Sequence, residues 1–315
     1  MHVRLTLAAA CLAAAAATRP LAAQCAMPME VTPRRELRVT AADLAARLAE
    51  PNLVVLHVSM SRGEYERGHV PGARWTDAHG WLADRDGLVW EVPPVARLDT
   101  LIEALGIGDD SRVVLYGDVG HLGRVFLALE VAGLAGRVAV FDGGLAAWRE
   151  AGQRVETAAA PARQGRFTPR PRADLVVDAA WMRERLGGRR IRIVDARSPA
   201  EYAGTAREDL PRTGHIPGAR LLEWTRSFRS PRATHDGDGD PGDGRLAEEA
   251  TLRRLFQGVG AEAGRPVVIY CTIGMRAAHL YYVARYLGYD ARLYDGSMQD
   301  WSGRADHPIT RGERP

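Results

Sequence analysis

The stretch Gly68-His69-Val70-Pro71-Gly72-Ala73 decides the fold, because it recurs downstream as Gly214-His215-Ile216-Pro217-Gly218-Ala219. Each copy follows an apolar segment and a Glu-Tyr pair, which is Glu64-Tyr65 in the first copy and Glu201-Tyr202 in the second. Self-similarity of this kind is the sequence sign of a repeated structural unit. The chain is therefore predicted to contain two copies of one domain.

Two further landmarks recur in the same order. Residues 113–117 match residues 267–271, and residues 140–148 match residues 293–301, while the second copy carries an insertion at 203–213. The length of 315 residues suits two domains of about 150 residues each. We place the N-terminal domain at 38–150, a linker rich in Ala, Arg, Gln and Pro at 151–172, and the C-terminal domain at 173–312.

Short β-branched runs alternate with longer amphipathic segments in each copy. In the first copy the runs at 54–58, 113–116 and 138–141 are predicted strands, and Ala-, Leu- and Arg-rich helical patterns lie between them. Such alternation predicts an α/β fold with mostly parallel sheets flanked by helices.

The composition excludes several classes of protein. Hydrophobic residues make up 46% of the chain and charged residues 26%, which is typical of a globular protein. All 42 basic residues are arginine, so lysine nucleophiles and Schiff bases are excluded. These arginines are interleaved with 39 acidic residues for a net charge of +3, and we expect no nucleic-acid partner.

Residues 1–23 are predicted to be a signal peptide that exports the protein to the periplasm. A weakly basic start precedes an apolar run at 5–17, and small residues follow it. We favour cleavage after Ala23, with Ala26 and Ala17 as alternatives. The apolar run is shorter than the roughly 18 residues that span a bilayer, so no membrane span is expected. A lipid anchor on Cys25 and an Ala-rich cytosolic extension are the alternatives.

Cysteine is scarce, which makes one position informative. Of three cysteines, Cys11 would leave with the signal peptide, so no disulfide framework is possible. An exported domain that keeps Cys271 deep in its sequence invites a chemical explanation. The alternative is a buried and inert thiol.

The segment from Cys271 to Arg276 is the candidate active loop. Residues 267–270 are predicted to form a buried strand and residues 277–287 a helix that Gly288 ends. Backbone N–H groups can converge there at the N-terminus of the helix, and together with Arg276 they would stabilise a thiolate. The predicted nucleophile is Cys271, and the loop residues predicted to bind substrate are Thr272, Ile273, Gly274, Met275 and Arg276.

The duplicated Gly-His segments, the cysteine loop and the Asp-Gly segments that end in Trp148 and Trp301 resemble the tandem rhodanese family of sulfurtransferases over residues 38–312. The resemblance implies two rhodanese folds, of which only the C-terminal one is catalytic. In the first copy Gly117 stands in the position of Cys271 and Leu122 in that of Arg276, so this copy should be silent and should wall the active-site cleft.

The resemblance implies a double displacement. The Cys271 thiolate takes the outer sulfur of thiosulfate, releases sulfite and passes the sulfur from a persulfide to cyanide or a thiol. Neither a metal nor another cofactor is expected, and two domains that complete one cleft suggest a monomer. Arg276, and Glu201 where 3-mercaptopyruvate enzymes carry Arg, favour thiosulfate; 3-mercaptopyruvate is the alternative donor.

Three more residues are candidates for supporting roles. Asp195 and Arg197 match the family's Asp-x-Arg element beside the loop, where they would hold the loop, steer anions or form a purely structural ion pair. Arg212, in preference to Arg207, matches a substrate-facing arginine in the insertion before Gly214.

Competing interpretations are weaker. A cysteine phosphatase or arsenate reductase on the same fold needs Cys-x5-Arg, whereas Cys271 and Arg276 form Cys-x4-Arg. A non-catalytic binding or redox-sensing module would not need both residues. The Asp-rich segment 236–243 lacks the glycine and the final glutamate of a calcium loop. Trp148 and Trp301 are predicted to be core aromatics, His69 and His215 are predicted to lie in turns that stabilise the fold, and His279 is predicted to be a helix-face residue that binds no metal.

Overall fold

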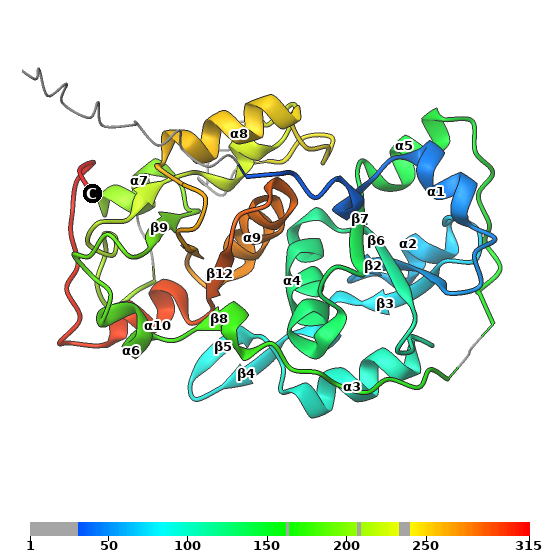
Figure 1. Cartoon of the computed structure of the whole chain (residues 1–315), viewed down its shortest axis with the longest axis horizontal. Helices are drawn as coiled ribbons and strands as arrows, with labels where there is room; N and C mark the ends of the chain where they lie inside the picture. Colours follow the sequence, from blue (N-terminus) through cyan, green and yellow to red (C-terminus); the bar gives the residue numbers. More distant parts are fainter. Residues whose placement is uncertain (1–30, 162–163, 207–208, 233–239) are drawn as a thin grey trace, which may run out of the picture.

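The computed structural model describes residues 31–161, 164–206, 209–232 and 240–315. The predicted signal peptide, Cys25, Arg207 and residues 236–239 of the Asp-rich segment lie outside the described residues. Within the described part, two five-stranded sheets form two α/β units, one on each side of a central pair of helices (Figure 1).

The two sheets have the same strand order. It is β1-β7-β6-β2-β3 in the first sheet and, read from its β8 edge, β8-β12-β11-β9-β10 in the second, and all neighbouring strands are parallel. The fold prediction and the internal duplication are therefore confirmed.

The strands of the first sheet are β1 (Arg38–Val39), β2 (Leu53–Ser59), β3 (Arg74–Asp77), β6 (Arg112–Gly117) and β7 (Val138–Phe141). Those of the second sheet are β8 (Val176–Val177), β9 (Arg192–Asp195), β10 (Arg220–Leu221), β11 (Val267–Tyr270) and β12 (Ala291–Tyr294). A two-stranded antiparallel hairpin leaves the first unit and consists of β4 (Ala83–Arg85) and β5 (Leu88–Glu91).

Helices flank both sheets. In the N-terminal unit they are α1 (Ala41–Arg47), α2 (Arg62–Glu66), α3 (Val95–Ala104), α4 (Val119–Leu129) and α5 (Gly144–Glu150). In the C-terminal unit they are α6 (Ala179–Arg183), α7 (Pro199–Ala203), α8 (Glu249–Gly258), α9 (Met275–Leu287) and α10 (Ser297–Gly303). Short helical turns lie at Arg35–Leu37, Ala78–Trp81, Glu130–Leu134, Ala173–Leu175 and Trp224–Ser227.

A single hydrophobic core joins the two units. Alternate residues of each sheet point inward to the same cluster, which also contains the inner faces of α4 and α9. Phe126 of α4 meets Tyr282 of α9 edge to face, with ring centroids 5.0 Å apart. A β-carbon at Gly123 would overlap the backbone of Ala278, so these two helices approach as closely as backbones allow. The interface between the copies is therefore an extension of the core.

The duplicated Gly-His segments have the same structural role in each unit. The Nδ1 atoms of His69 and His215 lie 2.8 Å from the carbonyl oxygens of Tyr65 and Tyr202, and each imidazole stacks on that tyrosine ring at 3.7 Å. The prediction that both histidines stabilise turns is confirmed. The rings of Trp148 and Trp301 are buried, as expected of core aromatics.

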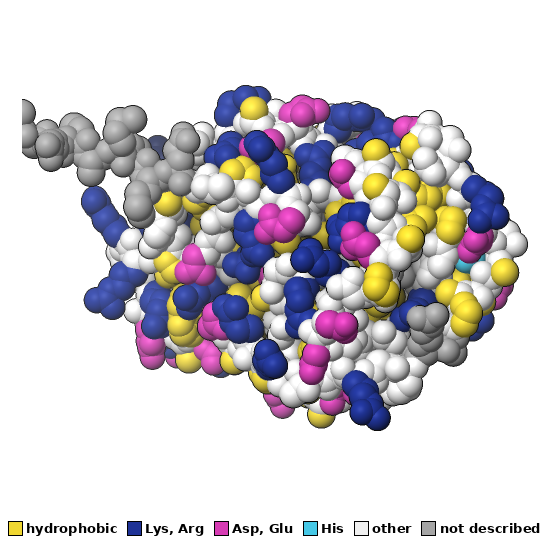
Figure 2. Space-filling model, turned by 45° about the vertical axis from the view of Figure 1, so that its right-hand side comes forward, with side chains coloured by type: hydrophobic (Ala, Val, Ile, Leu, Met, Phe, Trp, Pro, Cys, Tyr) yellow, Lys and Arg dark blue, Asp and Glu magenta, His cyan; other side chains and the backbone are white. Residues whose placement is uncertain are grey.

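The surface carries both signs of charge. Arginine and acidic side chains alternate over the face visible in Figure 2. Among the helices of the described residues, none is both long and apolar enough to cross a membrane.

Candidate active site

The strand β11 delivers Cys271 to the centre of the second sheet. The run Val-Val-Ile-Tyr is completely buried, and parallel pairing with β9 and β12 places its carboxyl end between two other strand ends. The predicted strand at 267–270 is thereby confirmed. The following helix begins at Met275, two residues before the predicted start, because Gly274 adopts a left-handed conformation with φ of 83° and forms the N-cap. Gly288 ends it as expected.

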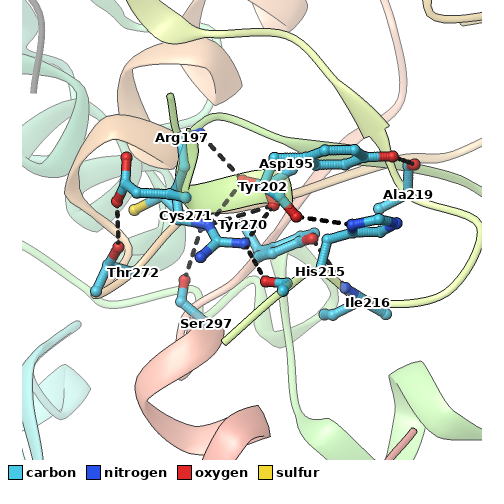
Figure 3. Close-up of polar contacts among 12 residues, drawn as sticks. Asp195, Arg197, Tyr202, His215, Ile216, Ala219, Tyr270, Cys271, Thr272 and Ser297 are labelled. Carbon is cyan, nitrogen blue, oxygen red and sulfur yellow. Dashed lines mark hydrogen bonds and ion pairs between the residues drawn. The ribbon is translucent and has the colours of Figure 1, made fainter. Parts of the chain in front are cut away.

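Cys271 lies in a tight cradle of backbone and hydroxyl groups, and Figure 3 shows its contact with the Ser297 hydroxyl. Its side chain is fully buried, and the backbone N–H of Gly274 donates to Sγ over 3.1 Å. The N–H of Cys271 donates to Ser297 Oγ at 3.2 Å, and its carbonyl accepts from the N–H of Met298 at 3.0 Å. A donor aimed at Sγ at the start of a 13-residue helix favours the negatively charged thiolate.

Arg276 is held by Glu201. Its guanidinium donates to both carboxylate oxygens of Glu201, at 2.6 and 2.8 Å, and to Thr272 Oγ1 at 2.8 Å. The Thr272 hydroxyl in turn donates to Glu201 at 3.1 Å. Burial opposes ionisation of Glu201, but the hydrogen bonds and charge of Arg276 prevail and lower its pKa to about 2. The structure thus brings two of the predicted loop residues, Thr272 and Arg276, into one ionic cluster with Glu201.

Asp195 and Arg197 form a second, completely buried ion pair beside the loop. Arg197 Nη2 lies 2.7 Å from Asp195 Oδ2 and also donates to the carbonyl of Gly214 at 2.7 Å. Asp195 ends β9 and pairs in register with Tyr270, directly before the cysteine. The pair therefore ties the repeated Gly-His segment to the strand end that carries Cys271 (Figure 3).

Arg212 lies elsewhere. Its guanidinium donates to the carbonyls of Trp301, Ser302, Arg304 and His307 at the end of α10. None of these partners belongs to the active loop, and the arrangement is that of a cation completing the last turn of a helix. The structure gives Arg212 a capping role, and none of its hydrogen bonds supports the predicted substrate contact.

The first copy has lost the cradle as well as the cysteine. There β6 runs to Gly117 and α4 begins at Val119, which leaves Asp118 alone as the connection. Gly117 has φ of 127°, and a β-carbon there would overlap the carbonyl oxygen of Val58. A cavity of about 430 Å³ remains above this connection and is lined by both units, including Phe228 and Leu246. What this copy has lost is the loop itself.

One functional contact escaped the sequence analysis. Arg124 of α4 is fully buried and extends from the N-terminal unit to the active loop, where it pairs with Asp295 and lies 3.3 Å from the carbonyl oxygen of Ile273. An arginine in the middle of a largely apolar helix that faces the core is the signal that could have found it.

Histidine and metal chemistry receive no support. The His279 ring is buried against Phe228 at 4.5 Å, its Nε2 lies 2.8 Å from Ser227 Oγ, and burial lowers its pKa to about 3. In the portion of the chain that the structure describes, no three His, Cys, Asp or Glu side chains gather as a metal site.

Known proteins share this architecture. A family model described as a rhodanese-like domain matches residues 40–151 and again 178–304. A probable 3-mercaptopyruvate sulfurtransferase of Pseudomonas aeruginosa is 32% identical over 292 residues, covering 87% of this chain and 98% of the relative. A thiosulfate sulfurtransferase of the same species is 30% identical over 277 residues, covering 87% and 96%. The crystal structure of YnjE matches with a TM-score of 0.76 and 25% identity, over 89% of this chain and 69% of that one.

The two parallel sheets and the family model that matches in both halves define the class of protein, which is one with two rhodanese-like domains. With both domains matched and relatives aligned over nearly their whole length, the chain belongs to the tandem-domain rhodanese family of sulfurtransferases.

Proposed function

We propose that the protein is a thiosulfate sulfurtransferase that works through a persulfide on Cys271. The observation that carries the proposal is the 3.1 Å hydrogen bond from the Gly274 N–H to Sγ at the N-terminus of α9. The same donor that stabilises a thiolate before reaction stabilises the terminal sulfur of a persulfide after it.

Two displacements complete the cycle. The Cys271 thiolate attacks the outer sulfur of thiosulfate, the sulfur–sulfur bond of the donor breaks, and sulfite leaves with its electron pair. Cyanide or a thiolate then attacks the terminal sulfur of the persulfide, and Cys271 leaves as the thiolate. The cycle begins and ends with the Cys271 thiolate, and the persulfide carries the negative charge between the two steps, so no general base is required.

The ionic cluster supports thiosulfate as the donor. Glu201 stays ionised next to the loop, and Arg276 is its partner. Glu201 occupies the position where, by the resemblance, 3-mercaptopyruvate enzymes carry an arginine, so this chain lacks at that position the cation that would receive the carboxylate of that donor. We assign Arg276 and the loop N–H groups to the sulfonate of thiosulfate, and the Asp195–Arg197 pair to support of the loop. 3-Mercaptopyruvate remains the second candidate, because the relative with that name is 32% identical.

The experiment is intact-mass measurement with sulfite assay after incubation with thiosulfate, in parallel with 3-mercaptopyruvate and with Cys271→Ser. The expected result is one added sulfur on wild type with thiosulfate, sulfite released, and neither with Cys271→Ser. If sulfur is added only from 3-mercaptopyruvate, then 3-mercaptopyruvate and not thiosulfate is the donor. Folded, reduced wild type that accepts sulfur from neither donor would leave a binding or redox-sensing protein as the better interpretation.

We also propose that the mature protein works in the periplasm. This rests on the sequence of residues 1–23 alone. N-terminal sequencing of the protein from the periplasmic fraction should give a start after Ala23. Recovery of the intact N-terminus from the cytosol would refute export.

A further inference from the structure

Arg124 connects the silent domain to the catalytic loop. It comes from α4, yet its Nη1 pairs with Asp295 of the Asp-Gly-Ser segment and its Nη2 lies 3.3 Å from the carbonyl oxygen of Ile273. The side chain is completely buried. An arginine keeps its positive charge in such a place, and a buried charge acts over a short distance with little screening from solvent. A fixed cation therefore lies next to the loop.

The peptide between Ile273 and Gly274 joins this cation to the thiol. Its carbonyl accepts from Arg124 at 3.3 Å, and its N–H donates to Cys271 Sγ at 3.1 Å. The bond is trans, so the two groups point in opposite directions from the same plane. A charged donor on the carbonyl polarises the amide and makes its N–H a stronger donor to the thiolate.

Glycine at 274 permits this approach. A β-carbon there would overlap Nη2 of Arg124 and would lie 3.0 Å from Asp295 Oδ1. With φ of 83°, the residue also adopts a conformation that other residues rarely tolerate. The loop is thus shaped to receive the guanidinium of the other domain.

The silent domain also fixes the partner of Arg124. Asp295 Oδ2 accepts from the N–H of Val92 at 2.7 Å, just after β5, while Oδ1 faces Arg124. Glu91 lies beside them and is buried. Burial, together with the charge of Asp295, raises the pKa of Glu91 well above its ordinary value, so Glu91 holds a proton beside the Arg124–Asp295 pair. Arg124 is therefore constrained from both ends.

We propose that Arg124 of the silent domain is a positioning residue for Cys271, which it activates through the Ile273–Gly274 peptide. The inference deepens the proposed function, because it takes Cys271 as the reacting thiol. The N-terminal copy thereby keeps a chemical role without a nucleophile of its own: it supplies the cation behind the donor that stabilises the thiolate.

The test measures alkylation of Cys271 by iodoacetamide as a function of pH, with the modified peptide identified by mass spectrometry. In Arg124→Met the half-maximal rate should move up by about one pH unit, alkylation at pH values below the wild-type midpoint should slow by up to about tenfold, and the alkaline plateau should stay unchanged. Arg124→Lys should recover part of the effect, because the charge remains but one ammonium cannot serve both partners in the same way.

Arg285→Met is the matched control. Arg285 of α9 forms another ion pair between the domains, with its Nε 3.1 Å from the carboxylate of Glu130. Glu130 is fully buried, as Arg124 is, but neither Arg285 nor Glu130 contacts the loop. Its removal should weaken the interface and leave the alkylation profile of Cys271 within about twofold of wild type. Because loss of Arg124 alone leaves Asp295 unpaired, the double variant Arg124→Met/Asp295→Asn removes both charges together and is measured in the same way.

An unchanged profile in folded Arg124→Met, or in the folded double variant, would overturn the proposal. An equal shift in Arg285→Met would do so too, because it would reduce Arg124 to a structural contact between the domains. The result is distinguishable from failure of the proposed function, since alkylation requires neither sulfur donor nor acceptor. A wild type that takes no sulfur from thiosulfate can still show the shift.

Discussion

Glu201→Gln tests the ionic cluster at the mouth of the loop. The Glu201 carboxylate receives two hydrogen bonds from Arg276 and one from the N–H of Ser198 at 2.8 Å, and its pKa falls from an ordinary 4.5 to about 2. Each pH unit of such a difference corresponds to about 1.4 kcal/mol, so the ionised carboxylate contributes about 3 kcal/mol to the free energy of unfolding at pH 7.

The pH dependence follows from the direction of this difference. The folded state favours the carboxylate, so the stabilisation is complete above pH 4.5 and is lost as the pH falls towards 2. Glu201→Gln should therefore be less stable than wild type by about 3 kcal/mol at pH 7, and the gap should narrow by about 2 kcal/mol between pH 7 and pH 3.

Urea denaturation followed by tryptophan fluorescence measures this gap, provided that wild type and variant have equal m values. Glu66→Gln is the control. The Arg62–Glu66 ion pair has the same chemistry, but both of its side chains are about 60% exposed. Surface ion pairs contribute about 0–1 kcal/mol to the free energy of unfolding, so this variant should differ little from wild type. A gap for Glu201→Gln that is absent, or that stays constant from pH 7 to pH 3, would refute this account of the cluster.

Three further predictions concern the loop and its surroundings. Gly117→Cys in a Cys271→Ser background should release no sulfite from thiosulfate, because the added β-carbon overlaps Val58 and the one-residue connection between β6 and α4 forms no loop around the new thiol. Sulfite release above that of Cys271→Ser alone would contradict this prediction. Gly274→Ala should lower the rate of sulfite release at least ~10-fold, because the strained left-handed backbone and the overlap of the new β-carbon with Arg124 both displace the N–H that donates to Cys271 Sγ. Gly72→Ala is the control, because Gly72 also has a positive φ but open space around it, and this variant should keep the wild-type rate. The raised pKa of Glu91 means that the folded state favours its protonated form, and this contribution to stability is lost as the pH rises above 4.5 and through the raised value. The Tm of wild type should therefore fall more between pH 5.5 and pH 8.5 than the Tm of Glu91→Gln. Parallel Tm curves for the two proteins would contradict this prediction.

Much of the fold could be predicted from local pattern. The strand at 267–270 and the end of its following helix at Gly288 agree with the structure, because buried runs and glycine stops are local signals. The start of that helix was placed two residues late. The left-handed Gly274 that begins it lies where a β-carbon would meet Arg124 and Asp295, and no local window of sequence contains these two residues.

The candidate site was predictable to a smaller extent. Cys271 and its loop follow from the strand-to-helix spacing, whereas Arg212 was matched by its position in the insertion and in fact caps α10 through four carbonyls. Arginine side chains are long, and proximity along the chain does not determine which carbonyls or carboxylates they reach. The pairing of Arg276 with Glu201, separated by 75 positions, depends in the same way on how α7 packs beside the loop.

By itself the sequence determined the duplication, the α/β class and the single cysteine at the end of a buried strand, because periodicity, repeated turns and residue scarcity are properties of the chain. Only the tertiary structure decided that the N-terminal copy reaches the loop that carries Cys271. Gly123 lets α4 and α9 approach within backbone contact, and this brings Arg124 across the shared core to Ile273, 149 positions away. Long-range packing selects such a pair, and no repeat or spacing encodes it.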